Sequence, residues 1–121
     1  MLKLRVAPLV LANRVRHGTA DDLPAVAHLL DRDRDHDRGS SIDPHTLAGL
    51  VDHGHLLVLE HGCDLGAAAH VVIDHAHGAL DLLVVDPALH GLGIEDRMTG
   101  VAEALCEAYG CASMDVRPGS R

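Results

Sequence analysis

Apolar residues recur along this chain with spacings that separate helices from strands. Between residues 23 and 30 they fall at i, i+3, i+4 and i+7, which places them on one face of a helix. These positions are Leu23, Val26, Ala27 and Leu30. Thr19 precedes the run, and Asp22 stands three residues after Thr19, as in a capping box. The pattern predicts a first helix that begins at Thr19.

The remaining apolar runs predict a second short helix, a long helix and five strands. Asp43-Pro44 opens the short helix, with Asp as cap and Pro in the first turn, and Gly54 ends it. Strands are expected at 14–17, 56–60, 65–73, 79–85 and 112–116, and the long helix at 92–109. Short glycine-containing links make strands 2 to 4 antiparallel neighbours, and the helical crossover makes the last two strands parallel. The predicted fold class is α/β (α+β), a mixed sheet in the order β-α-α-β-β-β-α-β.

Length and charge limit what this fold can do. The 121 residues support one domain, at 14–121, and residues 1–13 are expected to form a poorly ordered leader or an edge extension. A net charge of −8 and a single aromatic residue, Tyr109, argue against nucleic-acid binding. No run approaches the roughly 20 apolar residues of a membrane span. Three cysteines without a C-x-x-C pair favour a reduced, cytoplasmic protein.

The stretch from Val84 to Glu95 joins an apolar strand to a helix through a turn that holds Pro87, Gly91 and Gly93. A strand, a glycine turn and a helix start bring free backbone N–H groups and the positive helix end together, which attracts phosphate. No Lys-Ser or Lys-Thr follows, so this is not a Walker loop, and the Rossmann spacing lacks its third glycine. The alternative is a plain strand-to-helix turn in which glycine allows close backbone approach.

This stretch resembles the acetyl-CoA signature of the GCN5-related N-acetyltransferases (GNAT family). In that family a strand ending near a Pro is followed by Arg/Gln-x-x-Gly-x-Gly/Ala at the start of a long helix. The aligned positions here are His90, Gly93 and Glu95, so the middle position matches and the other two depart. From about residue 14 to residue 116 the element order is also the family's order. The family's final helix and last two strands are expected to be lacking.

The resemblance implies that acetyl-CoA is the cosubstrate and indicates where it would bind. The backbone of Val84 and Val85 would hold the pantetheine arm, and the following turn would grip the pyrophosphate. The cofactor-binding residues that it implies are Val84, Val85, His90, Gly91, Leu92, Gly93, Ile94, Glu95 and Asp96. Glu95 and Asp96 suit an empty helix start, and for the same reason they would compete with a bound pyrophosphate.

The resemblance further implies an N-acetyltransferase that acts on an unidentified amine, either a small molecule or a peptide. Asp81, on the strand before the turn, is the best-placed carboxylate for a general base. The competing interpretation places Asp81 on the solvated side of a half-buried strand. The strand at 112–116 would be left as an uncovered sheet edge, which predicts a homodimer through that edge.

Two other functions stay open. Glu95 and the lack of an assignable catalytic acid favour a non-catalytic GNAT-like binding or regulatory module. The eleven histidines raise a weaker alternative, a metal-binding protein, with H-x-H pairs at 53/55 and 75/77. A zinc site needs three or four converging ligands, and neither pair supplies them alone, so no metal site is predicted.

Overall fold

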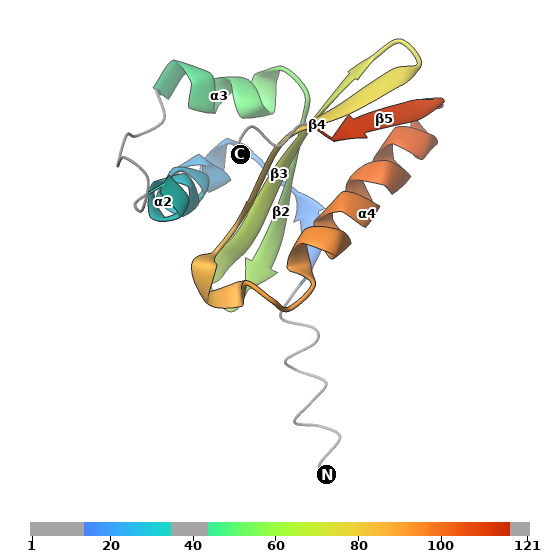
Figure 1. Cartoon of the computed structure of the whole chain (residues 1–121). Coiled ribbons are helices and arrows are strands. Elements are labelled where there is room, and N and C mark those ends of the chain that lie inside the picture. Colours follow the sequence, from blue (N-terminus) through green and yellow to red (C-terminus); the bar gives the residue numbers. More distant parts are fainter. Residues whose placement is uncertain (1–13, 35–43, 117–121) are drawn as a thin grey trace.

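The computed structural model of the chain describes residues 14–34 and 44–116 (Figure 1). Its elements, in chain order, are β1 (Val15–His17), the 3₁₀ helix η1 (Ala20–Asp22), α2 (Leu23–Arg34), α3 (Pro44–Asp52), β2 (His55–His61), β3 (Asp64–Asp74), β4 (His77–Val85), the 3₁₀ helix η2 (Pro87–Leu89), α4 (Ile94–Ala108) and β5 (Ser113–Val116). The predicted leader at 1–13 and the predicted cap at Asp43 lie outside the described residues.

The five strands form one sheet in the order β1-β2-β3-β4-β5. Neighbours pair antiparallel from β1 to β4, and β4 pairs parallel with β5. This confirms the predicted mixed sheet, and the predicted strand boundaries lie within two residues of the observed ones. The capping box at Thr19 is also present, although its first turn is the 3₁₀ helix η1.

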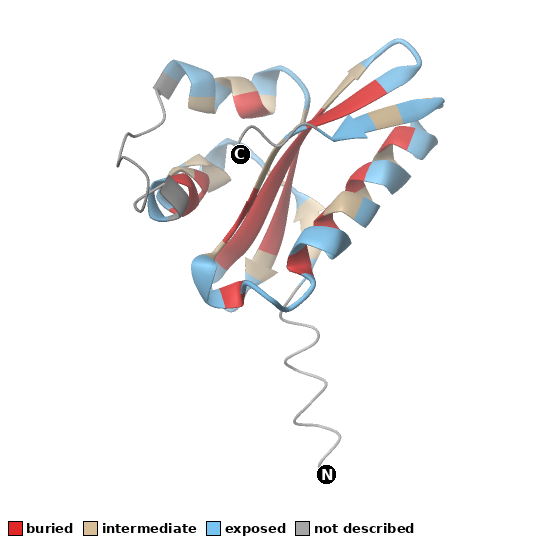
Figure 2. Cartoon of the chain, viewed as in Figure 1, coloured by how far each residue is buried: buried red, intermediate tan, exposed pale blue. Residues whose placement is uncertain are grey.

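Helices cover both faces of the sheet, α2 and α3 on one face and α4 on the other (Figure 1). Buried residues therefore line both sides of the central strands (Figure 2). In β3, Ala67, Ala68 and Ala69 are completely buried, as expected for a strand that helices cover on both faces. No helix in the described ranges is long and apolar enough to span a membrane.

The pairing of β4 changes at Asp81. On its β3 side, Leu80 pairs with Val71 and Leu82 pairs with His70, so Asp81 is the extra residue of a β-bulge. On its β5 side, the parallel pairing ends at Leu80, opposite Val116. Within the described residues, the outer edge of β4 after Leu80 therefore has no strand partner.

Candidate active site

The turn between β4 and α4 contains two glycines with left-handed backbone just before the helix begins. Gly91 and Gly93 have φ angles of 84° and 77°, a region that favours glycine. A Cβ atom at either position would meet nothing within 4 Å among the described residues, apart from its chain neighbours. Close packing therefore does not require glycine here, which removes the alternative explanation of tight backbone approach. The turn faces open space.

The backbone amides of this turn have no acceptor in the described part of the chain. Gly93 is the N-cap of α4 and provides no side-chain cap. The helical hydrogen bonds begin at Arg97, whose N–H donates to the Gly93 carbonyl at 3.1 Å. From Gly91 to Asp96, no backbone N–H donates to a described residue. Free N–H groups and the positive end of a 15-residue helix thus lie together at the surface.

The acidic residues of the first α4 turn leave these amides open. Glu95 and Asp96 are exposed, and neither carboxylate caps the helix. Their charges still lie next to the helix start, where they stabilise the ligand-free turn and oppose an incoming anion. An anion that binds here must therefore overcome two local negative charges.

Val84 and Val85 hold the end of β4 in place. Their side chains are 2% and 3% exposed and lie on opposite faces of the sheet, one in each core. On one edge their backbone pairs with Ala68 and Ala67 of β3. Their other edge lies beyond Leu80, the last residue of β4 that pairs with β5 among the residues described. Within the described residues, the predicted strand edge at Val84 and Val85 therefore has no strand partner.

The other predicted cofactor residues are consecutive, from His90 to Asp96. Ile94 is buried at 6% exposure and anchors the start of α4 in the core that α4 covers. Leu92, between the two glycines, is 66% exposed, and His90 is also exposed. His90 to Gly93, Glu95 and Asp96 thus lie at the surface, whereas Val84, Val85 and Ile94 are buried and anchor the two ends of the turn.

An ion pair that sequence reasoning missed fixes the beginning of this turn. Nη2 of Arg32, on α2, lies 2.8 and 2.9 Å from the two carboxylate oxygens of Asp86. The same carboxylate accepts from the Ala88 N–H at 3.0 Å and caps η2. The Asp86 side chain is only 13% exposed. This pair ties α2 to the turn after β4, and the separation of 54 positions along the chain leaves no local sequence signal.

The predicted base, Asp81, contacts a histidine that sequence reasoning also missed. Its Oδ1 lies 2.8 Å from Nδ1 of His70 on β3. His70 is 6% exposed, whereas the Asp81 side chain is 41% exposed. Asp81 is the first residue after the β4–β5 pairing ends, so it lies at the start of the unpaired edge. The interpretation of Asp81 as merely solvated is thus incomplete.

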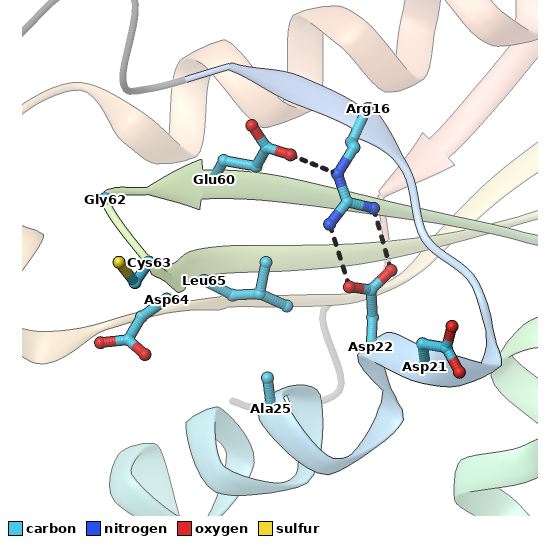
Figure 3. A pocket seen from close by; sticks show the side chains of 9 residues that line it. All are labelled: Arg16, Asp21, Asp22, Ala25, Glu60, Gly62, Cys63, Asp64 and Leu65. Atoms are coloured by element: carbon cyan, nitrogen blue, oxygen red, sulfur yellow. Dashed lines mark hydrogen bonds and ion pairs between the residues drawn. The ribbon is translucent and has the colours of Figure 1, made fainter.

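A pocket of about 360 Å³ lies at the opposite edge of the sheet, beside β1, the start of α2 and the β2–β3 turn (Figure 3). Its lining residues are Arg16, Asp21, Asp22, Ala25, Glu60, Gly62, Cys63, Asp64 and Leu65. Arg16 lies between two carboxylates, with Nε 2.6 Å from Glu60 and two contacts of 2.9 and 3.0 Å to Asp22. These hydrogen bonds hold the pKa of Asp22 and the pKa of Glu60 below their usual values. We interpret this arrangement as a structural clamp that joins β1, η1 and β2.

The histidine pairs do not form a metal centre in the described ranges. His75 Nδ1 lies 2.7 Å from Asp74, and His77 contacts Ser113 and Asp115 at 3.0 and 3.1 Å. No group of three or more His, Cys, Asp or Glu side chains that could hold a metal ion occurs among the residues that the structure describes. The His75 contact lies within the β3–β4 turn, and the His77 contacts connect β4 to β5.

Comparison with known proteins supports the fold at the level of structure. No protein-family model and no curated protein sequence matches the chain. The ribosomal-protein-S18-alanine N-acetyltransferase from Escherichia coli matches with a TM-score of 0.75 and 19% identity, over 86% of this chain and 65% of that protein. The chain thus spans slightly under two thirds of the length of that enzyme.

Two further solved structures have the same fold. A GNAT family acetyltransferase from Staphylococcus aureus matches with a TM-score of 0.68 and 15% identity, over 91% of this chain and 89% of that one. An aminoglycoside acetyltransferase from an uncultured soil metagenomic sample, in complex with sisomicin, matches with a TM-score of 0.72 and 15% identity, over 90% and 79%. At these identities the comparisons establish the fold and leave the chemistry to be argued from the site.

Proposed function

We propose that this chain, which has the fold of the GNAT acetyltransferases, transfers an acetyl group from acetyl-CoA to an amine. The observation that carries the proposal is the run of backbone amides from Gly91 to Asp96, which have no acceptor among the described residues, together with the edge of β4 that no described strand pairs with. A helix start that the protein does not cap is a site for an anionic group. The adjacent strand edge suits the extended, amide-containing arm that such a cosubstrate carries.

The residues present fit acetyl-CoA. Left-handed glycines with open space in front of them leave room for a pyrophosphate against the amides. Val84 and Val85 offer backbone groups along the edge of β4 that no strand of the described residues pairs with. When bound, acetyl-CoA supplies the thioester carbonyl that the amine attacks.

Asp81 is the base in this proposal. Its half-exposed carboxylate accepts a proton from the acceptor ammonium, which leaves a neutral amine as the nucleophile and a protonated Asp81. Deprotonation must come first because an ammonium has no lone pair with which to attack. The acceptor is an amine of a small molecule or a peptide.

Thermal unfolding with acetyl-CoA, CoA and inorganic pyrophosphate tests the binding site. A ligand that binds only the folded state raises the free energy of unfolding by RT ln(1 + [L]/Kd), and the melting temperature rises with it. We expect acetyl-CoA and CoA to raise it, with release of CoA thiol when an amine panel is added. No stabilisation by either, in the native chain and in Glu95→Gly alike, would overturn the proposal.

A second function, binding of a CoA-type ligand without turnover, is favoured by two observations. Glu95 and Asp96 stand beside the open amides, and His90 replaces the signature Arg/Gln. Such a module would be stabilised by CoA and acetyl-CoA equally and would release no thiol with any amine. The same two measurements therefore separate the two functions.

We also propose that two copies pair through the outer edge of β5 (Ser113–Val116). Val116 is 49% exposed at this edge, and exposed strand edges favour pairing with another chain. The Ala112 N–H donates to Ala76 on the β4 side, and N–H direction alternates along a strand, so the Asp115 N–H faces the outer edge. Sedimentation velocity should show a dimer that Asp115→Pro converts to a monomer, since proline cannot donate a ladder hydrogen bond. A monomer at every protein concentration contradicts the pairing.

A further inference from the structure

His70 is a polar side chain in a strand that is otherwise apolar at its centre. It follows the three buried alanines of β3 and is 6% exposed. Burial of an imidazole is unfavourable unless its nitrogens form hydrogen bonds. Nδ1 has a partner, the Asp81 carboxylate at 2.8 Å, whereas Nε2 is buried without a partner in the described part of the molecule. A position that only filled the core would be better served by an apolar residue.

The fold makes a specific space for this ring. Gly54 has a φ angle of 133°, and a Cβ atom there would lie 2.7 Å from Nε2 of His70 and 2.8 Å from the Val71 carbonyl oxygen. Residue 54 must therefore be glycine for the imidazole to occupy its place. The backbone of Gly54 covers the Nε2 side of the ring and leaves the Nδ1 side toward Asp81.

The β-bulge directs Asp81 to the same ring. Because Leu80 pairs with Val71 and Leu82 pairs with His70, Asp81 has no partner of its own on β3. A bulge breaks the regular alternation of a strand and re-aims one side chain. Here the re-aimed carboxylate meets Nδ1 of His70 at the point where β4 leaves β5.

We propose that His70 is a positioning residue that holds the Asp81 carboxylate in place for proton abstraction, an inference that rests on the function proposed above. Nδ1–H donates to Oδ1, since the facing carboxylate can only accept at that nitrogen. Oδ2 stays free to accept the proton of the acceptor ammonium, so that R–NH₃⁺ and the carboxylate become R–NH₂ and the carboxylic acid. His70 fixes the geometry of the base and does not touch the substrate.

The tautomer of His70 gives a test that does not depend on activity. A long-range ¹H–¹⁵N spectrum of the native chain should show His70 with its proton on Nδ1, and His70→Asn identifies the signal by its loss. Replacement of Asp81 by Ala should remove the preference for Nδ1, because the carboxylate no longer selects that nitrogen. A bare Nδ1 in the native protein would overturn the inference.

Kinetics of two substitutions test the role itself. His70→Leu removes the donor at similar volume, whereas His70→Asn keeps an N–H near the position of Nδ1. We expect kcat to fall about 10- to 100-fold in His70→Leu, because a displaced catalytic group loses that much. KM for acetyl-CoA should stay unchanged, and His70→Asn should recover most of kcat. His75→Asn, on an exposed turn, serves as the control and should keep the native rate.

The outcomes separate this inference from the proposed function. Loss of activity in Asp81→Asn together with native kcat in His70→Leu would contradict the role of His70 and leave the proposed function standing. Absence of acetyl transfer in the native chain would remove the proposed function, and the catalytic role of His70 with it. If His70→Leu does not fold, a His70→Asn variant that folds but is as slow as Asp81→Asn also contradicts the inference.

Discussion

Two strand-to-helix turns in this molecule differ in how they treat the backbone N–H groups at the start of the following helix. After β1, Thr19 accepts from the Asp21 N–H at 3.3 Å, and the Asp22 carboxylate accepts from the Thr19 N–H at 2.8 Å. After β4, the turn that contains Gly91 and Gly93 has no such side-chain cap. The turn at Thr19 (the closed turn) has its backbone N–H groups capped by its own side chains. The turn at Gly91 and Gly93 (the open turn) has no side-chain cap.

The difference supports the proposed binding role of the turn after β4. Unpaired N–H groups at a helix start are normally satisfied by a side chain, and a Ser, Thr, Asp or Asn cap contributes about 1 kcal/mol. The β1 turn gains this stabilisation and is reinforced further by Arg16, which contacts Asp22. The β4 turn lacks it, as expected of a surface that an external anion completes.

The largest effect is expected when the proposed base, Asp81, is replaced. Asp81→Asn should lower the rate of acetyl transfer about 100-fold or more, because loss of a general base has that magnitude. Stabilisation by acetyl-CoA should persist, since the amides of the turn are unchanged. Thiol release and thermal unfolding measure the two effects, and a rate that equals the native one would exclude Asp81 as the base.

Removal of the cap at the closed turn should act on stability alone. Thr19→Ala is expected to lower the free energy of unfolding by about 1 kcal/mol. The shift in melting temperature that acetyl-CoA produces should not change, because the two turns lie at different edges of the sheet. Urea denaturation measures the first quantity, and an altered ligand shift would argue against the separation of the two turns.

A substitution at the open turn should lower the free energy of unfolding and increase the affinity for acetyl-CoA. Glu95→Ala removes a charge that stabilises the empty helix start by about 0.3–1 kcal/mol. The free energy of unfolding should fall by that amount, and acetyl-CoA should bind about two- to five-fold more tightly. Glu103→Ala, an exposed position farther along α4, is the matched control. Weaker binding in Glu95→Ala would contradict the proposed anion site.

The ion pairs of Arg16 at the closed turn should affect how the free energy of unfolding changes at acid pH. Arg16 holds the pKa of Asp22 and the pKa of Glu60 below their ordinary values of 3.8 and 4.5. Below about pH 4.5 the unfolded chain therefore binds more protons than the folded chain, and stability is lost as the pH falls through the lowered folded values. Urea denaturation between pH 7 and 3 should show a steeper loss in the native chain than in Arg16→Met.

The titration of His55 also changes the free energy of unfolding in that experiment. Burial lowers the pKa of His55, with the nearby His17 and His70 adding to the effect, so stability also declines as the pH falls below 6.5. This loss occurs in the native chain and in Arg16→Met and cancels in their difference. Parallel curves below pH 4.5 would mean that the Arg16 clamp does not contribute to stability.

The sequence predicts the elements well because their signals are local. Apolar spacing locates α2 and α4, and short glycine turns give the antiparallel order of β2 to β4. The Thr19 capping box was also predictable, since its members stand three residues apart. The location of the open turn after β4 follows from the same kind of short-range pattern.

The contacts that complete the site could not be predicted in this way. The His70–Asp81 pair depends on a bulge that shifts the register by one residue, and no feature of residues 70–81 specifies it. The Arg32–Asp86 pair joins α2 to the turn after β4, and it forms only when that helix packs on the sheet. Both depend on tertiary geometry, where the spacing of residues along the chain carries no information.

The Arg32–Asp86 pair has a consequence for how related sequences can vary. The Asp86 carboxylate is 13% exposed, and its burial becomes unfavourable once Arg32 is lost. Substitution of either residue alone is therefore expected to be destabilising. In homologous chains, a neutral residue at position 32 should be accompanied by a neutral residue at position 86. The outer surface of α2 and the first residue of the β4–α4 turn are therefore expected to evolve as one unit.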